Sequence, residues 1–119
     1  MTPIYEVDVL TLHPEMVRAP LLGSVLGRAA DAGLLRIGVH DIRDHGLGRH
    51  RSVDDAPFGG GAGMVMRVDV VAASLATVRR PESHVVLLGP AGRPFVQAEA
   101  RRLATLPHLV LICGHYEGI

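Results

Sequence analysis

The chain has 119 residues, which fits a single domain that buries a modest core. Hydrophobic residues make up 48% of it, yet there is no Trp and there are only two Phe and two Tyr, so we expect an aliphatic core. The net charge is zero, which argues against a surface that attracts nucleic acid everywhere, although the basic residues are all Arg, the side chain best suited to phosphate.

The first third of the chain predicts two strands with a helix between them. Residues Ile4–Leu12 alternate and then become continuously apolar, which indicates a strand that His13-Pro14-Glu15 ends. Ser24 is typical of a helix N-cap and Gly33 of a helix stop, so we expect a helix through Ala32. Leu35–Ile42 predicts the second strand.

The remainder predicts two more helices and two more strands. A long polar, glycine-rich stretch, Arg43–Gly63, predicts an irregular loop, and such a loop inside a compact domain is usually either functional or disordered. Asp69 is a candidate N-cap for a helix through Arg79. The short apolar run His84–Leu88 predicts a third strand of the kind that is buried on both faces in parallel sheets.

After the turn Gly89–Pro94, Val96–Thr105 predicts a helix and Leu109–Cys113 a fourth strand. The resulting order, β-α-β-loop-α-β-α-β, favours an α/β fold with a parallel sheet and helices on both faces. A buried strand is normally followed by a covering helix, whereas Gly114–Ile119 closes the chain. We therefore interpret the sequence as truncated, and expect a poorly soluble monomer or a partner-bound chain.

The carboxyl ends of the predicted strands are where a ligand is expected. Three segments follow those ends: Arg43–Gly63, Gly89–Pro94 and Gly114–Ile119. Glycine lets the backbone approach a flat ligand such as adenine, because no side chain intervenes. Either short turn alone is most simply an ordinary connection, but the pair together with the long loop favours a site.

The glycine cluster over residues 58–64 (FGGGAGM) matches neither common phosphate-binding motif. A P-loop needs Lys followed by Ser or Thr after the last glycine, and the dinucleotide pattern needs glycine at its sixth position. Two interpretations remain: a flexible loop, or a backbone that closes over a planar base. Just upstream, Arg49, Arg51 and Asp54 offer groups for phosphates and base edges, or form local ion pairs in a solvated loop.

The cysteine and histidine pattern bears on metals and on location. Cys113 is the only cysteine, so it forms no internal disulfide and is most simply a small buried hydrophobe. No Cys-x₂-Cys spacing exists, which argues against a structural zinc site and predicts no protein-bound metal from spacing. No secretory signal and no apolar run near ~18 residues is visible, so we expect a cytoplasmic protein without a membrane span.

Four motifs in this sequence resemble, in the same order, those of the bacterial tRNA (guanine-N1)-methyltransferases. Residues 49–64 (RHRSVDDAPFGGGAGM) are similar to the family's R-H-R-x-V-D-D-x-P-[YF]-G-G-G-x-G-M. Residues 113–119 (CGHYEGI) resemble its C-G-x-Y-E-G-I turn, while residues 12–16 and 88–93 resemble its L-F-P-E-M and L-S-P-x-G-R. Departures are His115 for Arg, Gly89 for Ser and Ala62 for Pro. These leave the family clear and put cofactor affinity in question.

The resemblance implies the N-terminal part, residues 1–119, of a trefoil-knotted methyltransferase domain that binds S-adenosyl-L-methionine and, with Glu117 assisting, Mg²⁺. It implies a homodimer that acts on tRNA, methylating N1 of the guanosine 3′ of the anticodon. The cofactor pocket would be formed by Leu87, Leu88, Gly89, Pro90, Gly114, Tyr116, Glu117 and Gly118. The tRNA would be contacted by Arg49, Arg51, Asp54 and Gly63.

Asp54 and Glu117 are supporting catalytic candidates, whereas the family's main general base lies beyond Ile119. We therefore expect the full protein to be an enzyme and this stretch alone to be inactive. Two other classes stay open. A non-catalytic RNA-binding or dimerisation module would bind RNA without the cofactor, and a P-loop hydrolase, disfavoured by the missing Lys, would turn over ATP.

Overall fold

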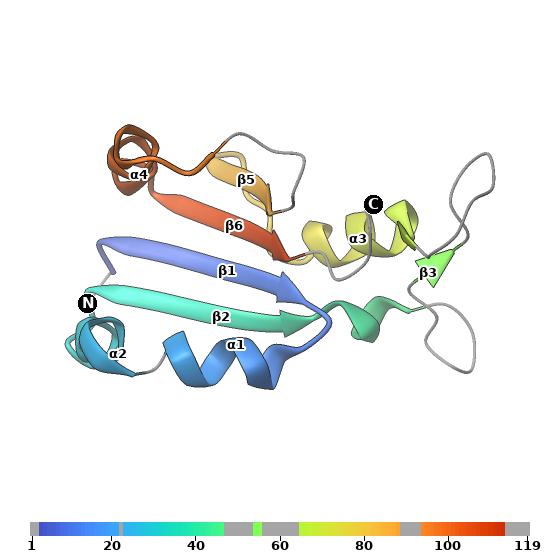
Figure 1. Cartoon of the computed structure of the whole chain (residues 1–119), viewed down its shortest axis with the longest axis horizontal. Coiled ribbons are helices and arrows are strands. Elements are labelled where there is room, and N and C mark those ends of the chain that lie inside the picture. Colours follow the sequence, from blue (N-terminus) through green and yellow to red (C-terminus); the bar gives the residue numbers. More distant parts are fainter. Residues whose placement is uncertain (1–2, 22, 47–53, 56–64, 89–93, 114–119) are drawn as a thin grey trace.

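The computed structural model describes residues 3–21, 23–46, 54–55, 65–88 and 94–113, with 24, 54–55 and 65–66 described by their backbone. Within these ranges four strands form one parallel sheet in the order β2-β1-β6-β5 (Figure 1). This confirms the predicted α/β class with a parallel sheet. The strands are β1 Tyr5–Thr11, β2 Leu35–Asp41, β5 Ser83–Leu88 and β6 His108–Cys113.

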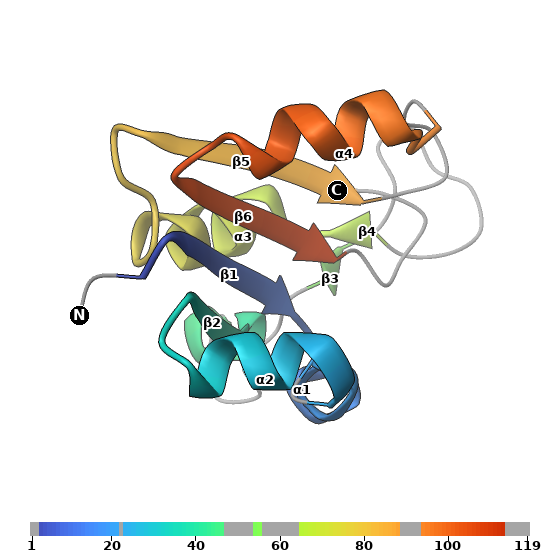
Figure 2. The ribbon, with the colours of Figure 1, turned by 90° about the vertical axis from the view of Figure 1, so that its left-hand side faces the viewer.

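Four α-helices accompany the sheet in the described residues: α1 Pro14–Leu21, α2 Ser24–Asp31, α3 Val68–Ala76 and α4 Gln97–Ala104. Figure 2 shows α3 behind the sheet and the other three helices in front of it. The Tyr5 hydroxyl donates to the Leu103 carbonyl at 2.8 Å, which ties α4 to the front face of β1. The predicted placement of helices on both faces is therefore confirmed.

The apolar core lies between α3 and the carboxyl half of the sheet. Leu10, Val110 and Ile112 alternate along β1 and β6 on the face that α3 covers, and Val70 and Val71 of α3 pack against them. Leu10 and Val110 are completely buried. The aliphatic core expected from composition is what the structure contains, since every member of this cluster is Val, Leu or Ile.

Several local expectations were wrong in detail. Pro14 was expected only to end the first strand, but it is also the first residue of α1. At the first position of a helix the missing N–H of proline costs nothing, and its fixed φ suits the helix. The N-cap of α2 is Gly23, and that of α3 is Arg67, so Ser24 and Asp69 each lie one or two positions inside their helices. Gly33 does end α2's turn, with a positive φ of 78°.

The predicted loop Arg43–Gly63 is not wholly irregular. A short 3₁₀ helix, η1 Ile42–His45, follows β2 and packs against α3. Two-residue strands β3 Asp54–Asp55 and β4 Val65–Met66 then pair antiparallel, with Asp54 opposite Met66. Residues 47–53 and 56–64 lie outside the described residues.

We expect the core substitution Leu10→Ala to lower the free energy of unfolding by about 2–5 kcal/mol, because it removes a fully buried side chain from the apolar cluster and leaves a cavity. Urea denaturation of the full-length protein would measure this. Leu34→Ala is the matched control: Leu34 is 44% exposed, so its truncation should cost less than about 1 kcal/mol. Equal losses for both would contradict the core described here.

Candidate functional site

The carboxyl edge of the sheet brings together the segments that carry the sequence motifs. The four parallel strands end at this edge with Thr11, Asp41, Leu88 and Cys113. Whatever follows each strand therefore starts beside the others, as in α/β sheets that bind ligands beyond their strand ends. The segments in which the sequence predicts a site therefore all leave the sheet at one edge.

Local hydrogen bonds set how the chain leaves β1 and β2 at this edge. The Thr11 hydroxyl accepts from the His13 backbone N–H at 3.1 Å, which turns the chain towards α1. The Asp41 carboxylate accepts from the Arg43 N–H at 2.8 Å and caps η1. Ile42, completely buried, anchors η1 in the core below α3. The entry to the glycine-rich loop is therefore fixed to the sheet.

Of the residues expected to contact cofactor, Leu87 and Leu88 are in the described part of the chain. They end β5 and border an open apolar groove of about 1240 Å³ between β5 and α4, together with Phe95, Val96 and Leu111. Leu87 and Leu88 are about half exposed. Apolar walls of this kind suit a planar, mostly apolar ligand group.

The other expected site residues mostly fall outside the described residues. For the cofactor these are Gly89, Pro90, Gly114, Tyr116, Glu117 and Gly118, and for tRNA they are Arg49, Arg51 and Gly63. Asp54 is described by its backbone, which lies in β3 opposite β4. Its pairing ties the middle of the motif at 49–64 to the chain just before α3.

The described part of the chain offers neither a metal site nor a membrane span, and Cys113 is its only thiol. Those residues contain no group of three His, Cys, Asp or Glu side chains able to hold a metal ion. No helix among them is long and apolar enough to cross a membrane. Cys113 is half-buried, and burial raises the pKa of its thiol, so it stays protonated and behaves as the small hydrophobe expected from its strand.

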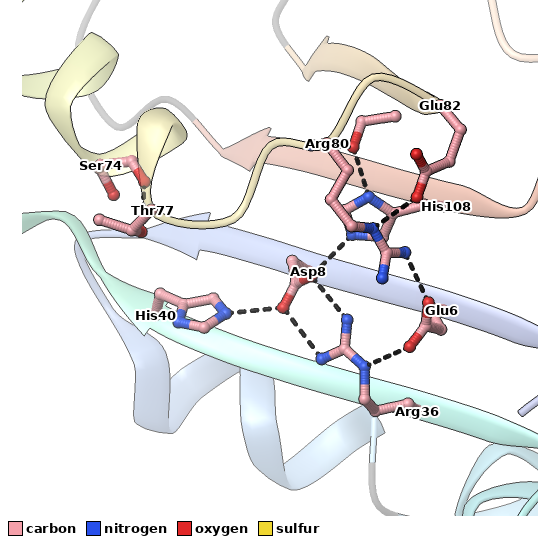
Figure 3. A network of polar contacts seen from close by, with 10 residues as sticks. Glu6, Asp8, Arg36, His40, Ser74, Thr77, Arg80, Glu82 and His108 are labelled. Atoms are coloured by element: carbon pink, nitrogen blue, oxygen red, sulfur yellow. Dashed lines mark hydrogen bonds and ion pairs between the residues drawn. The ribbon is translucent and has the colours of Figure 1, made fainter. Parts of the chain in front are cut away.

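Sequence reasoning missed a cluster of charged side chains on the face of the sheet that α3 covers only in part (Figure 3). The Asp8 carboxylate of β1, 3% exposed, lies at its centre. Arg36 of β2 donates to both of its oxygens, at 3.2 and 2.8 Å. The Nε2 atoms of His40 and His108 lie 2.7 Å from one oxygen each. Because an ionised carboxylate only accepts, both imidazoles donate to it.

Further polar contacts extend this cluster across the whole sheet. Glu6 accepts from Arg36 at 2.9 Å and from Arg80, just before β5, at 2.5 Å. The Ser83 hydroxyl of β5 lies 2.5 Å from Nδ1 of His108, which is completely buried in β6. All four strands are thereby joined through polar groups. The signal in the sequence was two acidic residues, spaced by two, in an otherwise apolar strand.

The electrostatics of the cluster follow from its burial and its donors. Burial alone would raise the pKa of Asp8, but the hydrogen bonds from Arg36, His40 and His108 outweigh it and hold that pKa well below its ordinary value. Hydrogen bonds from Arg80 and Arg36 likewise lower the pKa of Glu6. Asp8 in turn raises the pKa of Arg36. Both carboxylates are therefore ionised at neutral pH.

Gly38 makes room for this arrangement. It is the residue of β2 directly opposite Asp8. A Cβ at Gly38 would overlap the Oδ1 atom of Asp8 and would lie 2.8 Å from Nε2 of His40. The buried carboxylate thus occupies the space that any other residue at this position would need for its side chain.

The fold defines an α/β domain built on a parallel sheet. A family model described as tRNA (Guanine-1)-methyltransferase TrmD matches residues 5–119, so the chain belongs to this methyltransferase family.

Three curated relatives, each named tRNA (guanine-N(1)-)-methyltransferase, agree with this. The Chloroflexus aggregans protein is 56% identical over 115 residues, which are 94% of this chain and 45% of that protein. A Thermus thermophilus protein is 56% identical over 110 residues, 92% of this chain and 46% of its own length. The protein from Anaeromyxobacter sp. is 47% identical over 121 aligned residues, which cover 100% of this chain and 49% of that protein. The chain thus spans about half the length of the curated relatives it matches.

We expect Gly38→Ala to destabilise the full-length protein by about 1–3 kcal/mol in urea denaturation, because the new methyl group displaces a carboxylate held by three donors. Gly23→Ala is the matched control, since its nearest atoms would be 3.8 and 3.9 Å away, and it should cost less than about 1 kcal/mol. In an Asp8→Ala background the Gly38→Ala penalty should shrink. A penalty that stays the same would mean that Asp8 is not what fills the space.

The lowered pKa of Asp8 predicts a pH dependence of stability. The unfolded chain takes up a proton on Asp8 near pH ~3.9 while the folded chain resists it, so the contribution of Asp8 is present above that pH and is lost as pH falls further. Asp8→Asn should therefore cost about 2–4 kcal/mol at pH 7, and the gap to wild type should narrow below about pH 4. Urea denaturation between pH 3 and 7 tests this. A gap independent of pH would contradict it.

Proposed function

We propose that the full-length protein transfers a methyl group from S-adenosyl-L-methionine to N1 of the guanosine immediately 3′ of the anticodon, tRNA position 37. The family match over residues 5–119 is the observation that carries this proposal. The motifs in those residues follow strands that all end at one edge of the sheet. Because the chain spans about half the length of its relatives, we assign this activity to a protein of the relatives' length and expect residues 1–119 alone to be inactive.

The cofactor would lie at the carboxyl ends of β5 and β6. The apolar groove beside Leu87 and Leu88 supports this, since it offers aliphatic surface to an adenine ring. The backbone of residues 87–90 would form one wall and that of residues 114–118, with Tyr116 and Glu117, the other. When bound, S-adenosyl-L-methionine supplies an electrophilic methyl group on a sulfonium.

The residues of this chain would then bind and position the tRNA. Arg49 and Arg51 would hold phosphates, and Gly63 would let the backbone lie against the target base. Guanine N1 carries a proton at neutral pH, so a base must remove it as charge develops on O6. Asp54 and Glu117 would support that step, while the main base would lie in the part of the protein beyond residue 119.

The protein would act as a homodimer in the cytoplasm, with one subunit holding cofactor while the other helps to bind the guanosine. Glu117 would assist a Mg²⁺ ion, for which a carboxylate oxygen is a suitable ligand.

The proposal predicts that the full-length protein methylates a tRNA transcript carrying guanosine at position 37 and leaves a transcript with adenosine there unmodified. Mass spectrometry of the digested tRNA would detect N1-methylguanosine. Calorimetry should show S-adenosyl-L-methionine binding to the full-length protein and none to residues 1–119. If the full-length protein binds tRNA but neither binds the cofactor nor methylates, a non-catalytic RNA-binding or dimerisation module replaces this proposal.

Within that assay, Arg49→Ala combined with Arg51→Ala should raise KM for tRNA about tenfold or more and leave cofactor affinity unchanged, because these side chains would contact phosphates alone. Arg28→Ala with Arg18→Ala removes the same charge from α1 and α2 and serves as the control. An equal rise in KM for both pairs would show that net charge, not this loop, binds the tRNA.

A further inference from the structure

The hydrophobic pattern of β1 and β2 does not by itself fix how these two strands align. Alternate residues of β1 and β2 lie on the front face, and in the middle of both strands these are apolar: Val7 and Val9 lie beside Ile37 and Val39. Sliding one strand by two residues would keep all of these on the same face. Hydrophobic burial alone therefore distinguishes poorly between the native register and one slipped by two residues.

On the opposite face of the same two strands, a slip by two residues would change which kinds of side chain lie opposite each other. There the register places Glu6 opposite Arg36, Asp8 opposite Gly38 and Leu10 opposite His40. Gly38 is the only glycine in β2. The Asp8 carboxylate leans over it and fills the position of the missing side chain, held there by Arg36 and His40 from the two flanking rows.

We propose that Asp8 and Gly38 form a register lock, in which the buried carboxylate of β1 allows β2 to pair beside it only with its glycine directly opposite. A slip by two residues in one direction puts Arg36 opposite Asp8, and a slip in the other direction puts His40 there. Either residue brings a Cβ into the space that the carboxylate occupies. If the carboxylate turned away from this space, it would lose the hydrogen bonds that it accepts in the native register from Arg36, His40 and His108, and the loss of donors is costly for a buried charge.

The register lock would also keep the carboxyl ends of β1 and β2 aligned at one edge of the sheet. A two-residue slip moves β2 by about 6.6 Å along β1. Asp41, which caps η1 at the end of β2, would move with it, and so would the start of the segment that carries the motif at residues 49–64. His108 contributes from the other side of Asp8, so β6 is aligned against the same carboxylate.

Engineered disulfides on the front face of the full-length protein would report the register. Val9→Cys with Val39→Cys joins positions that are directly opposite in the native sheet. Val9→Cys with Ile37→Cys joins positions about 8 Å apart, too far to bridge unless β2 slips. Both reporters carry Cys113→Ala, and alanine at any cysteine of the full-length protein outside residues 1–119, so that no natural thiol competes. The stability of each disulfide is measured in a glutathione redox buffer.

The proposal expects Asp8→Ala to raise the equilibrium yield of the slipped disulfide about tenfold or more, and Gly38→Ala to raise it as well, because the native register then also meets a Cβ. Glu6→Ala is the matched control: it removes a carboxylate with two Arg partners from the same strand and face but leaves the space at Gly38 filled. It should leave the slipped yield unchanged.

Two results would overturn the lock. One is an equilibrium yield of the slipped disulfide, between positions 9 and 37, that neither Asp8→Ala nor Gly38→Ala changes. The other is an equal rise in Glu6→Ala, which would mean that loss of any ion pair loosens the sheet. If Asp8→Ala fails to fold, Gly38→Ala, which keeps every charge, decides the question alone.

Discussion

A carboxylate enclosed in the middle of a parallel sheet is the constraint around which this chain is organised. Removing the charge of Asp8 from water is costly, and the structure offsets the cost with donors from both neighbouring strands, Arg36 and His40 on β2 and His108 on β6. Because those donors sit at fixed positions along their strands, satisfying one carboxylate also aligns three strands. Glu6 and Arg80 carry the same connection on towards β5.

The face of the sheet that bears this cluster is divided into two parts with separate roles. Leu10, Val110 and Ile112 pack under α3 and supply the apolar burial that stabilises the fold. Beside them, the charged cluster around Asp8 adds little apolar burial, and in the proposed register lock it discriminates between alignments. The motifs at residues 12–16, 49–64, 88–93 and 113–119 lie at or after the carboxyl ends of the four strands.

Much of this architecture could be predicted from local pattern. The four strands of the sheet were expected within one residue of their observed ends, because apolar runs bounded by Gly and Pro are strong signals. Helix starts were less predictable: Pro14 reads as a strand breaker and as a first helical residue equally well, and α1 was missed for that reason. At the site, the placement of Leu87 and Leu88 at the end of β5 was predictable, since parallel strands all finish at one edge.

The sequence by itself determined the fold class, the aliphatic core and the family, because these depend on composition, periodicity and motifs that are contiguous in the chain. Only the tertiary structure decided which polar residues meet. Asp8 and His108 are 100 positions apart, and nothing local to either shows that they share a hydrogen bond. Gly38 likewise reads as a weak point in a strand until the carboxylate that fills its empty side is in place. Pairing across a sheet depends on residues far apart in the chain, and in the proposed register lock it is decided by the cost of leaving a buried charge unpaired.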